Sequence, residues 1–278
     1  MLTKYLSRFF ARHRHNRIVS RIARGLVELQ QGYENLNYNY FENGENFVLD
    51  IIRQHLAVET VFDVGANQGE WSKIAAKKFS EARIYSFEVL PETHRQLVAN
   101  CKAHPRIVPV AFGLGDREEE REVYYAPGRG GKTTCVANFF EIFHGGQAQV
   151  GRGKVLTGDR FCRDQGVGAI DFLKLDVEGY EPQVLKGFQE MLAAGKIRIV
   201  QFEYGYINVA THFLLKDFYE FFHLFRMRAG KIYPNHVDFR EYRFQDENFL
   251  GPNYLAVQAS LEPLIEALKR GHLRRMIS

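Results

Sequence analysis

Short apolar segments alternate with amphipathic segments along most of the chain. The apolar segments are rich in β-branched and aromatic residues, which is typical of buried strands. Six strands are predicted in this way, at 59–65, 82–89, 106–113, 169–177, 197–205 and 252–259. Apolar residues at helical spacing predict helices at 47–56, 68–79, 91–103, 180–195 and 215–225.

Strands that alternate with helices are typical of a parallel, doubly wound α/β sheet with helices on both faces. We therefore expect one α/β domain over residues 46–260. A basic amphipathic helix and a linker are expected over 1–45, with the polar, aromatic stretch 31–45 as the linker. A C-terminal helix or tail is expected over 261–278.

One glycine-rich stretch, residues 126–158, interrupts the alternation. Long irregular segments inside compact domains are commonly lids or binding loops. We interpret 126–158 as such a loop, and a disordered insertion is the alternative.

The basic residues are concentrated ahead of the predicted domain. Of the 37 Lys and Arg residues, seven precede the first acidic residue, Glu28, so the rest of the chain has fewer basic than acidic side chains. Residues 2–27 combine these cations with apolar residues near helical spacing, which predicts one amphipathic helix. Two interpretations stay open: peripheral membrane contact through residues 1–27, or packing on the domain or on a second copy, giving a homo-oligomer.

Composition also bears on compartment and partners. Cys101, Cys135 and Cys162 are far apart and form no metal or redox motif, which is typical of reduced thiols in a cytosolic protein. No run is apolar enough to span a membrane, and the start of the chain lacks the apolar core of a secretory signal. We therefore expect a cytoplasmic protein, with membrane association as an addition. A nucleic-acid partner is not expected, because the cations lie outside the predicted sheet.

Acidic residues recur where predicted strands end, at the edge where open parallel sheets bind ligands. The first strand ends in DVGANQG, where Gly65 and Gly69 allow a tight turn and a close approach of a ligand. Asp63 beside this turn suits a ligand with an ammonium group. The next strand ends at Glu88, where nucleotide-binding folds carry the acid that accepts hydrogen bonds from ribose hydroxyls.

The glycine pattern GxNxG narrows the choice of ligand. It differs from the GxGxxG of dinucleotide sites and from the GxxxxGK[ST] of P-loops, which disfavours an oxidoreductase and a nucleotide triphosphatase. S-adenosylmethionine has both the ammonium group and the ribose that these acids suit.

Two further predicted strands end in acids, within FLKLDVEG and QFEYG. Lys174 and Asp176 share one face of their strand by alternation. Asp176 is the leading candidate for a general base, with Lys174 and Glu203 as supporting charges. Alternatively, Asp176 and Glu203 share a divalent cation. Further candidate bases are His144, His212 and His236.

Six segments, taken in order, resemble the FkbM family of S-adenosylmethionine-dependent methyltransferases. They are VFDVGANQGEW, YSFEVLPETHRQLVAN, AFGLGD, DFLKLDVEGYEPQVLKG, VQFEYG and NYLAV, and they cover roughly residues 45–258. The resemblance implies the class I methyltransferase fold, a Rossmann-like, seven-stranded, mostly parallel sheet with an antiparallel last hairpin. It also implies O-methylation of a hydroxyl-bearing small molecule or glycan, in many such enzymes a sugar or natural product.

The resemblance also implies roles for individual residues. The methionine part of the cofactor would lie on Asp63, Gly65, Ala66, Asn67 and Gly69. Glu88 would hold the ribose, Asp116 would lie near the adenine, and Asp176 would face the reacting centre. The basic helix and the loop 126–158 are not part of the shared pattern, so the acceptor is not identified. A non-catalytic protein or a nucleic-acid methyltransferase on the same fold is the alternative.

Overall fold

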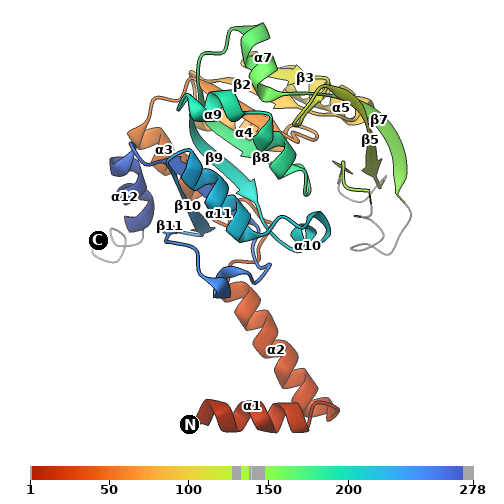
Figure 1. Ribbon diagram of the computed structural model, residues 1–278, viewed down its shortest axis with the longest axis vertical. Coiled ribbons are helices and arrows are strands. Elements are labelled where there is room, and N and C mark those ends of the chain that lie inside the picture. Colours follow the sequence, from red (N-terminus) through yellow and green to blue (C-terminus); the bar gives the residue numbers. More distant parts are fainter. Residues whose placement is uncertain (1, 127–132, 138, 140–147, 272–278) are drawn as a thin grey trace.

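The computed structural model describes residues 2–126, 133–137, 139 and 148–271. An eight-stranded sheet forms the centre of the body, with helices on both faces (Figure 1). Its strand order is β11-β10-β12-β9-β8-β1-β2-β3. The strands span β1 Thr60–Val64, β2 Arg83–Phe87, β3 Ile107–Val110, β8 Ile170–Leu175, β9 Ile197–Glu203, β10 Met227–Tyr233, β11 His236–Phe239 and β12 Asn253–Gln258.

The five strands from β3 to β9 pair in parallel, and β12, β10 and β11 join with antiparallel pairing. The α/β class and the mostly parallel sheet are thus confirmed, as are all six predicted strands. The expected count of seven is corrected to eight, because β11 extends the last hairpin. Strand β10 was not predicted, because Lys231 is buried inside it where an apolar residue was expected, and β11 was missed as a strand of only four residues.

Two apolar layers sandwich this sheet. Val61, Phe172 and Ile199 face one layer, together with the helices α3 Glu45–His55, α4 Glu70–Lys78, α5 Pro91–Cys101 and α12 Glu262–Arg270. Neighbouring strand residues face the other layer, which contains α7 Gly158–Gln165, α8 Glu181–Lys186, α9 Gln189–Ala193 and α11 Leu215–Leu224. Each fully buried aliphatic or aromatic side chain contributes about 1.5–3 kcal/mol to such a core.

A smaller sheet follows β3 along the chain, in the order β4-β7-β5-β6. Its strands are β4 Gly113–Leu114, β5 Glu119–Tyr125, β6 Thr133–Thr134 and β7 Gln149–Leu156. The described ends of 126–158 are therefore strands and not irregular loop. Glycines did not prevent β7, because the strand passes so close to Val89 that a Cβ on Gly153 would lie 2.3 Å from its side chain.

Two helices, α1 Leu2–Arg12 and α2 Arg17–Tyr33, precede the body, where one helix was predicted. The break falls at residues 13–16, because the Asn16 side chain caps α2 by accepting hydrogen bonds from the N–H groups of Ile18 (2.9 Å) and Val19 (3.3 Å). Helix α2 projects away from the sheet, and α1 lies across its far end (Figure 1). Within the described residues, no helix combines the length and apolar character needed to cross a membrane.

Candidate active site

The turn after β1 is built around a buried carboxylate. Asp63 is inaccessible to solvent, and one of its oxygens accepts a hydrogen bond of 2.5 Å from the Ser72 hydroxyl. Its other oxygen, Oδ1, has no hydrogen-bond partner among the described residues. Burial raises the pKa of Asp63, although nearby Lys174 and the Ser72 hydroxyl oppose this shift. Asp63 thus has one acceptor oxygen that no described residue engages.

The two glycines of the turn are required by the protein's own packing. A Cβ on Gly65, whose φ is +86°, would lie 1.9 Å from the carbonyl oxygen of Asp176. A Cβ on Gly69 would lie 2.6 Å from Cys101 and Leu97 of α5. Gly65, Ala66 and Asn67 line a cavity, but Gly69 is not among its lining residues. Gly69 therefore serves the packing of α5.

Glu88, at the end of β2, is fixed by backbone donors. Its carboxylate accepts hydrogen bonds from the N–H groups of Asn67 (3.1 Å) and Leu90 (2.9 Å). The side chain is 3% exposed, and burial raises its pKa to about 7 despite these bonds. The carboxylate joins the turn after β1 to the start of α5 and lines a second cavity.

The ends of β8 and β9 bring three predicted residues together. The Lys174 ammonium donates to Asp176 Oδ2 at 2.7 Å. Burial alone would lower the pKa of Lys174, but Asp176, Asp63 and Glu45 outweigh it and raise that pKa. Burial, together with Asp176 and Glu178, raises the pKa of Glu203 well above its usual value. Lys174 is thus a fixed cation, and Glu203 is a carboxyl group that resists ionisation.

Two adjoining cavities meet at these carboxylates. The smaller, about 400 Å³, is lined by Glu88 and by apolar residues that include Val89 and Leu114. The larger, about 770 Å³, is lined by Asp63 and Lys174. Both are lined by Tyr38, Gly65, Asn67, Glu70, Thr133, Asp176 and Glu203. This places the shared wall at the carboxyl ends of β1, β8 and β9.

Several lining residues were not predicted. Glu45, at the start of α3, accepts hydrogen bonds from the amides of Gln201 (2.7 Å), Asn253 (3.1 Å) and Asn43 (2.8 Å). Trp71 lines the larger cavity beside Lys174, whose Nζ lies 5.4 Å from the ring centroid. The stretch 31–45, interpreted as a linker, supplies Tyr38 and Tyr40 to the cavity wall. The sequence offered one signal for Glu45, which is that an acidic residue begins the helix there.

The structure does not bring every candidate to the cavities. Asp116 is exposed and lines neither of them. His212 and His236 also lie outside both cavity walls, and the His236 ring stacks on Tyr233. His144 lies outside the described residues. Among the residues that are described, no group of three or more His, Cys, Asp or Glu side chains is arranged to hold a metal ion.

Comparison with known proteins identifies the family. Residues 63–227, more than half of the chain, match the model of the methyltransferase FkbM domain. The AMB antimetabolite synthetase AmbE of Pseudomonas aeruginosa is 28% identical over 216 residues, which are 64% of this chain and 10% of that protein. The hexuronic acid methyltransferase AglP of Haloferax volcanii is 27% identical over 164 residues, which are 58% of this chain and 64% of that protein.

The match therefore spans less than two thirds of either of these relatives. Among solved structures, the methyltransferase FkbM from Methylobacillus flagellatus aligns with a TM-score of 0.46 and 16% identity. That alignment covers 72% of this chain and 44% of the other. On the match to the family model, the chain belongs to the FkbM methyltransferase family.

Proposed function

We propose that the chain is an S-adenosylmethionine-dependent O-methyltransferase that acts on a hydroxyl of a sugar, glycan or glycolipid. The observation that carries this proposal is the pair of cavities that share Asp176 and Glu203 on one wall. A donor and an acceptor in separate cavities would meet at that wall. The name of the Haloferax relative, a hexuronic acid methyltransferase, supports a sugar as the acceptor.

The residues present fit this cofactor. The free Oδ1 of Asp63 suits the ammonium of the methionine part, and Glu88 has acceptor capacity left for two ribose hydroxyls. The apolar wall around Leu114 suits an adenine ring. When bound, S-adenosylmethionine supplies a methyl group already activated by its sulfonium. The protein then needs only to align the acceptor, exclude water and remove one proton.

We assign proton removal to Glu203 in place of Asp176, which the sequence favoured. Asp176 Oδ2 already accepts a hydrogen bond from the buried Lys174 ammonium, so this oxygen is engaged within the protein. Glu203 has a raised pKa and lines both cavities, so its ionised form has a stronger tendency to take a hydroxyl proton. In this proposal Asp176 and Lys174 orient the acceptor.

A divalent cation shared by Asp176 and Glu203 is a second way to activate the hydroxyl. Among the described residues, no third His, Cys, Asp or Glu side chain is placed to complete a metal site with these two carboxylates. Turnover that disappears with a chelator and returns with Mg²⁺ would favour the cation. Turnover that a chelator leaves unchanged would favour Glu203 acting alone.

A cytoplasmic location, a homo-oligomer and membrane contact through residues 1–27 also remain proposals. None of them is needed for the chemistry at the cavities. Contact of the basic helices with a membrane can be tested without an acceptor.

Calorimetric titration with S-adenosylmethionine tests the cofactor. The intact chain should bind saturably, and Glu88→Ala should lose binding. Glu120→Ala is a matched control, because Glu120 is exposed and lines neither cavity. Transfer of labelled methyl groups to a panel of sugars then tests the acceptor. Absence of cofactor binding by the intact chain would reject the proposal in favour of a non-catalytic protein.

A further inference from the structure

Helix α1 and the bend after it carry exposed charges of one sign. Lys4, Arg8 and Arg12 are spaced four residues apart and share one side of α1, and Arg14 and Arg17 follow in the bend and at the start of α2. All five are exposed, and none forms an ion pair with a described residue. No acidic residue occurs before Glu28, so this positive charge is not offset locally.

The same helix exposes apolar side chains beside these cations, with Tyr5 at the edge of the cationic side and Leu6 and Phe9 further round the helix. Tyr5, Leu6 and Phe9 are 71%, 44% and 44% exposed, although each would be buried in an ordinary surface helix. Figure 1 shows α1 clear of the sheet, at the far end of α2. A helix with apolar residues on one side and Lys and Arg beside them is typical of helices that lie in the interface of an anionic membrane.

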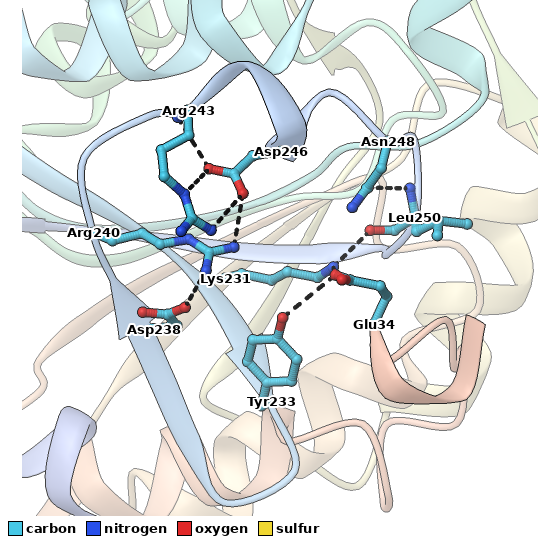
Figure 2. A network of polar contacts seen from close by, with 9 residues as sticks. All are labelled: Glu34, Lys231, Tyr233, Asp238, Arg240, Arg243, Asp246, Asn248 and Leu250. Atoms are coloured by element: carbon cyan, nitrogen blue, oxygen red, sulfur yellow. Dashed lines mark hydrogen bonds and ion pairs between the residues drawn. The ribbon is translucent and has the colours of Figure 1, made fainter. Parts of the chain in front are cut away.

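The other end of α2 is fixed firmly to the body. The buried Lys231 ammonium contacts the Glu34 carboxylate at 2.7 Å and donates to the Leu250 carbonyl oxygen at 2.9 Å (Figure 2). The Asn35 amide donates to the carbonyl oxygens of Asn43 (2.8 Å) and Ile232 (2.9 Å). These contacts make α2, about 25 Å long at 1.5 Å per residue, a defined spacer between α1 and the sheet.

Residues 34–45, which we call the strap, connect this attachment to the larger cavity. Gly44, the next-to-last residue of the strap, lies against β10, where a Cβ would be 2.1 Å from the Tyr233 carbonyl oxygen. Tyr38, Tyr40 and Glu45 of the strap line the cavity. The strap is held at both ends, so the orientation of α1 sets how the cavity faces any surface to which α1 binds.

We propose that α1 and the bend at residues 13–17 dock on an anionic lipid surface, with Tyr5, Leu6 and Phe9 inserted among the head groups. We favour a lipid surface over a second copy of the chain because anionic lipids attract the cations of α1. The α1 helix of a second copy carries the same cations and would repel them. Docking holds the larger cavity at a fixed distance from the lipid. It does not depend on methyl transfer, so each can be tested without the other.

The test is co-sedimentation of the full chain with vesicles of phosphatidylcholine alone or mixed with phosphatidylglycerol. Binding should require phosphatidylglycerol and weaken with added salt. The variant Lys4→Gln/Arg8→Gln/Arg12→Gln should bind about 100-fold more weakly, since each cation near such a surface strengthens binding about fivefold. Leu6→Ser/Phe9→Ser should also lose binding. Titration with S-adenosylmethionine should be unchanged in both variants.

The matched control is Lys77→Gln/Arg95→Gln/Lys102→Gln, which removes three exposed cations of the body that form no ion pair with a described residue, and it should bind vesicles normally. Equal loss in this control would show that net charge, and not α1, governs binding, and would overturn the proposal. Failure of the intact chain to bind phosphatidylglycerol vesicles would also overturn it. So would a chain that is dimeric by light scattering and becomes monomeric in Leu6→Ser/Phe9→Ser.

Discussion

The ammonium of Lys174 lies 2.7 Å from Oδ2 of Asp176, and the residue is buried beneath the carboxylates at the ends of β1, β8 and β9. This one ammonium therefore interacts with several carboxylates, namely those of Asp176, Asp63 and Glu45. Glu203 lies at the shared wall of the two cavities, where burial together with Asp176 and Glu178 raises its pKa. The shared wall thus combines a fixed ion pair with a carboxyl group that titrates.

Glu203→Gln should lower turnover more than Asp176→Asn does. Removal of a general base typically costs about 10²–10⁴ in rate. Loss of an orienting carboxylate should instead raise KM for the acceptor and lower kcat less. Steady-state kinetics of both variants, with calorimetry to show that S-adenosylmethionine still binds, make the comparison. A larger fall in kcat for Asp176→Asn would return the role of base to Asp176.

Lys174→Met should lower the free energy of unfolding by about 3 kcal/mol, since removal of one partner of a buried pair strands the other charge. This value is the lower end of the usual cost of breaking a buried ion pair, because the Asp176 side chain is still 35% exposed. Urea unfolding measures the change. The double variant Lys174→Met/Asp176→Asn should recover part of it, and a double variant less stable than Lys174→Met would argue against a compensating pair.

Affinity for S-adenosylmethionine should tighten as the pH rises through about 7, the pKa to which burial raises Glu88. Ribose hydroxyls donate to the ionised carboxylate, and about a tenth of Glu88 is ionised one unit below that pKa. Titrations near pH 6 and pH 8 should therefore differ about tenfold. Glu88→Gln should bind weakly at both values, and an unchanged pH dependence in this variant would assign the effect to another group.

The same shift predicts how stability depends on pH without the cofactor. The pKa of Glu88 is higher in the folded chain than the usual value near 4.5. Protonation therefore favours the folded state, so the stabilisation is complete below about 4.5 and is lost as the pH rises through about 7. Glu88→Gln should flatten the stability profile in that window, as unfolding by urea at several pH values can measure.

Much of the sheet could be predicted because its strands are buried on both faces and form apolar runs. The acids that end these strands were found for the same reason, since the ends of parallel strands meet at one edge. Strand β10 was not predicted, because Lys231 interrupts its apolar pattern. This lysine is buried through an ion pair with Glu34, which is distant in the sequence.

The contribution of Glu45 and the strap to the cavity depends on contacts that no local pattern records. Glu45 meets Gln201 and Asn253, which are far from it in the sequence, through hydrogen bonds that form only when α3 packs beside β9 and β12. For Asp116 the local sequence misled instead. Its motif suggested a position near the adenine, but its side chain is exposed and lies outside both cavities. The assigned roles of the site residues remain predictions.

Gly65→Ala should be far more damaging than Gly166→Ala. Both glycines have positive φ, so both variants should lose about 1–2 kcal/mol to a left-handed backbone. A Cβ on Gly166 has no atom within 4 Å, whereas on Gly65 it meets the backbone of Asp176. Displacement of Asp176 should therefore add a loss of turnover in Gly65→Ala only. Equal unfolding free energies and turnover for the two variants would refute the close approach.

Lys231→Met should loosen the strap. Met retains most of the apolar length of Lys but cannot bond to Glu34 or to the Leu250 carbonyl oxygen. Loss of a hydrogen bond to a charged group costs about 1.5–3 kcal/mol, so amide exchange in residues 34–43 should speed up by about 10–100-fold. Arg228→Met is the control, because Arg228 lies on the same strand but pairs with Glu262. Faster exchange in both variants would indicate general loosening of β10, and unchanged exchange in Lys231→Met would mean that Asn35 and Gly44 hold the strap without the ion pair.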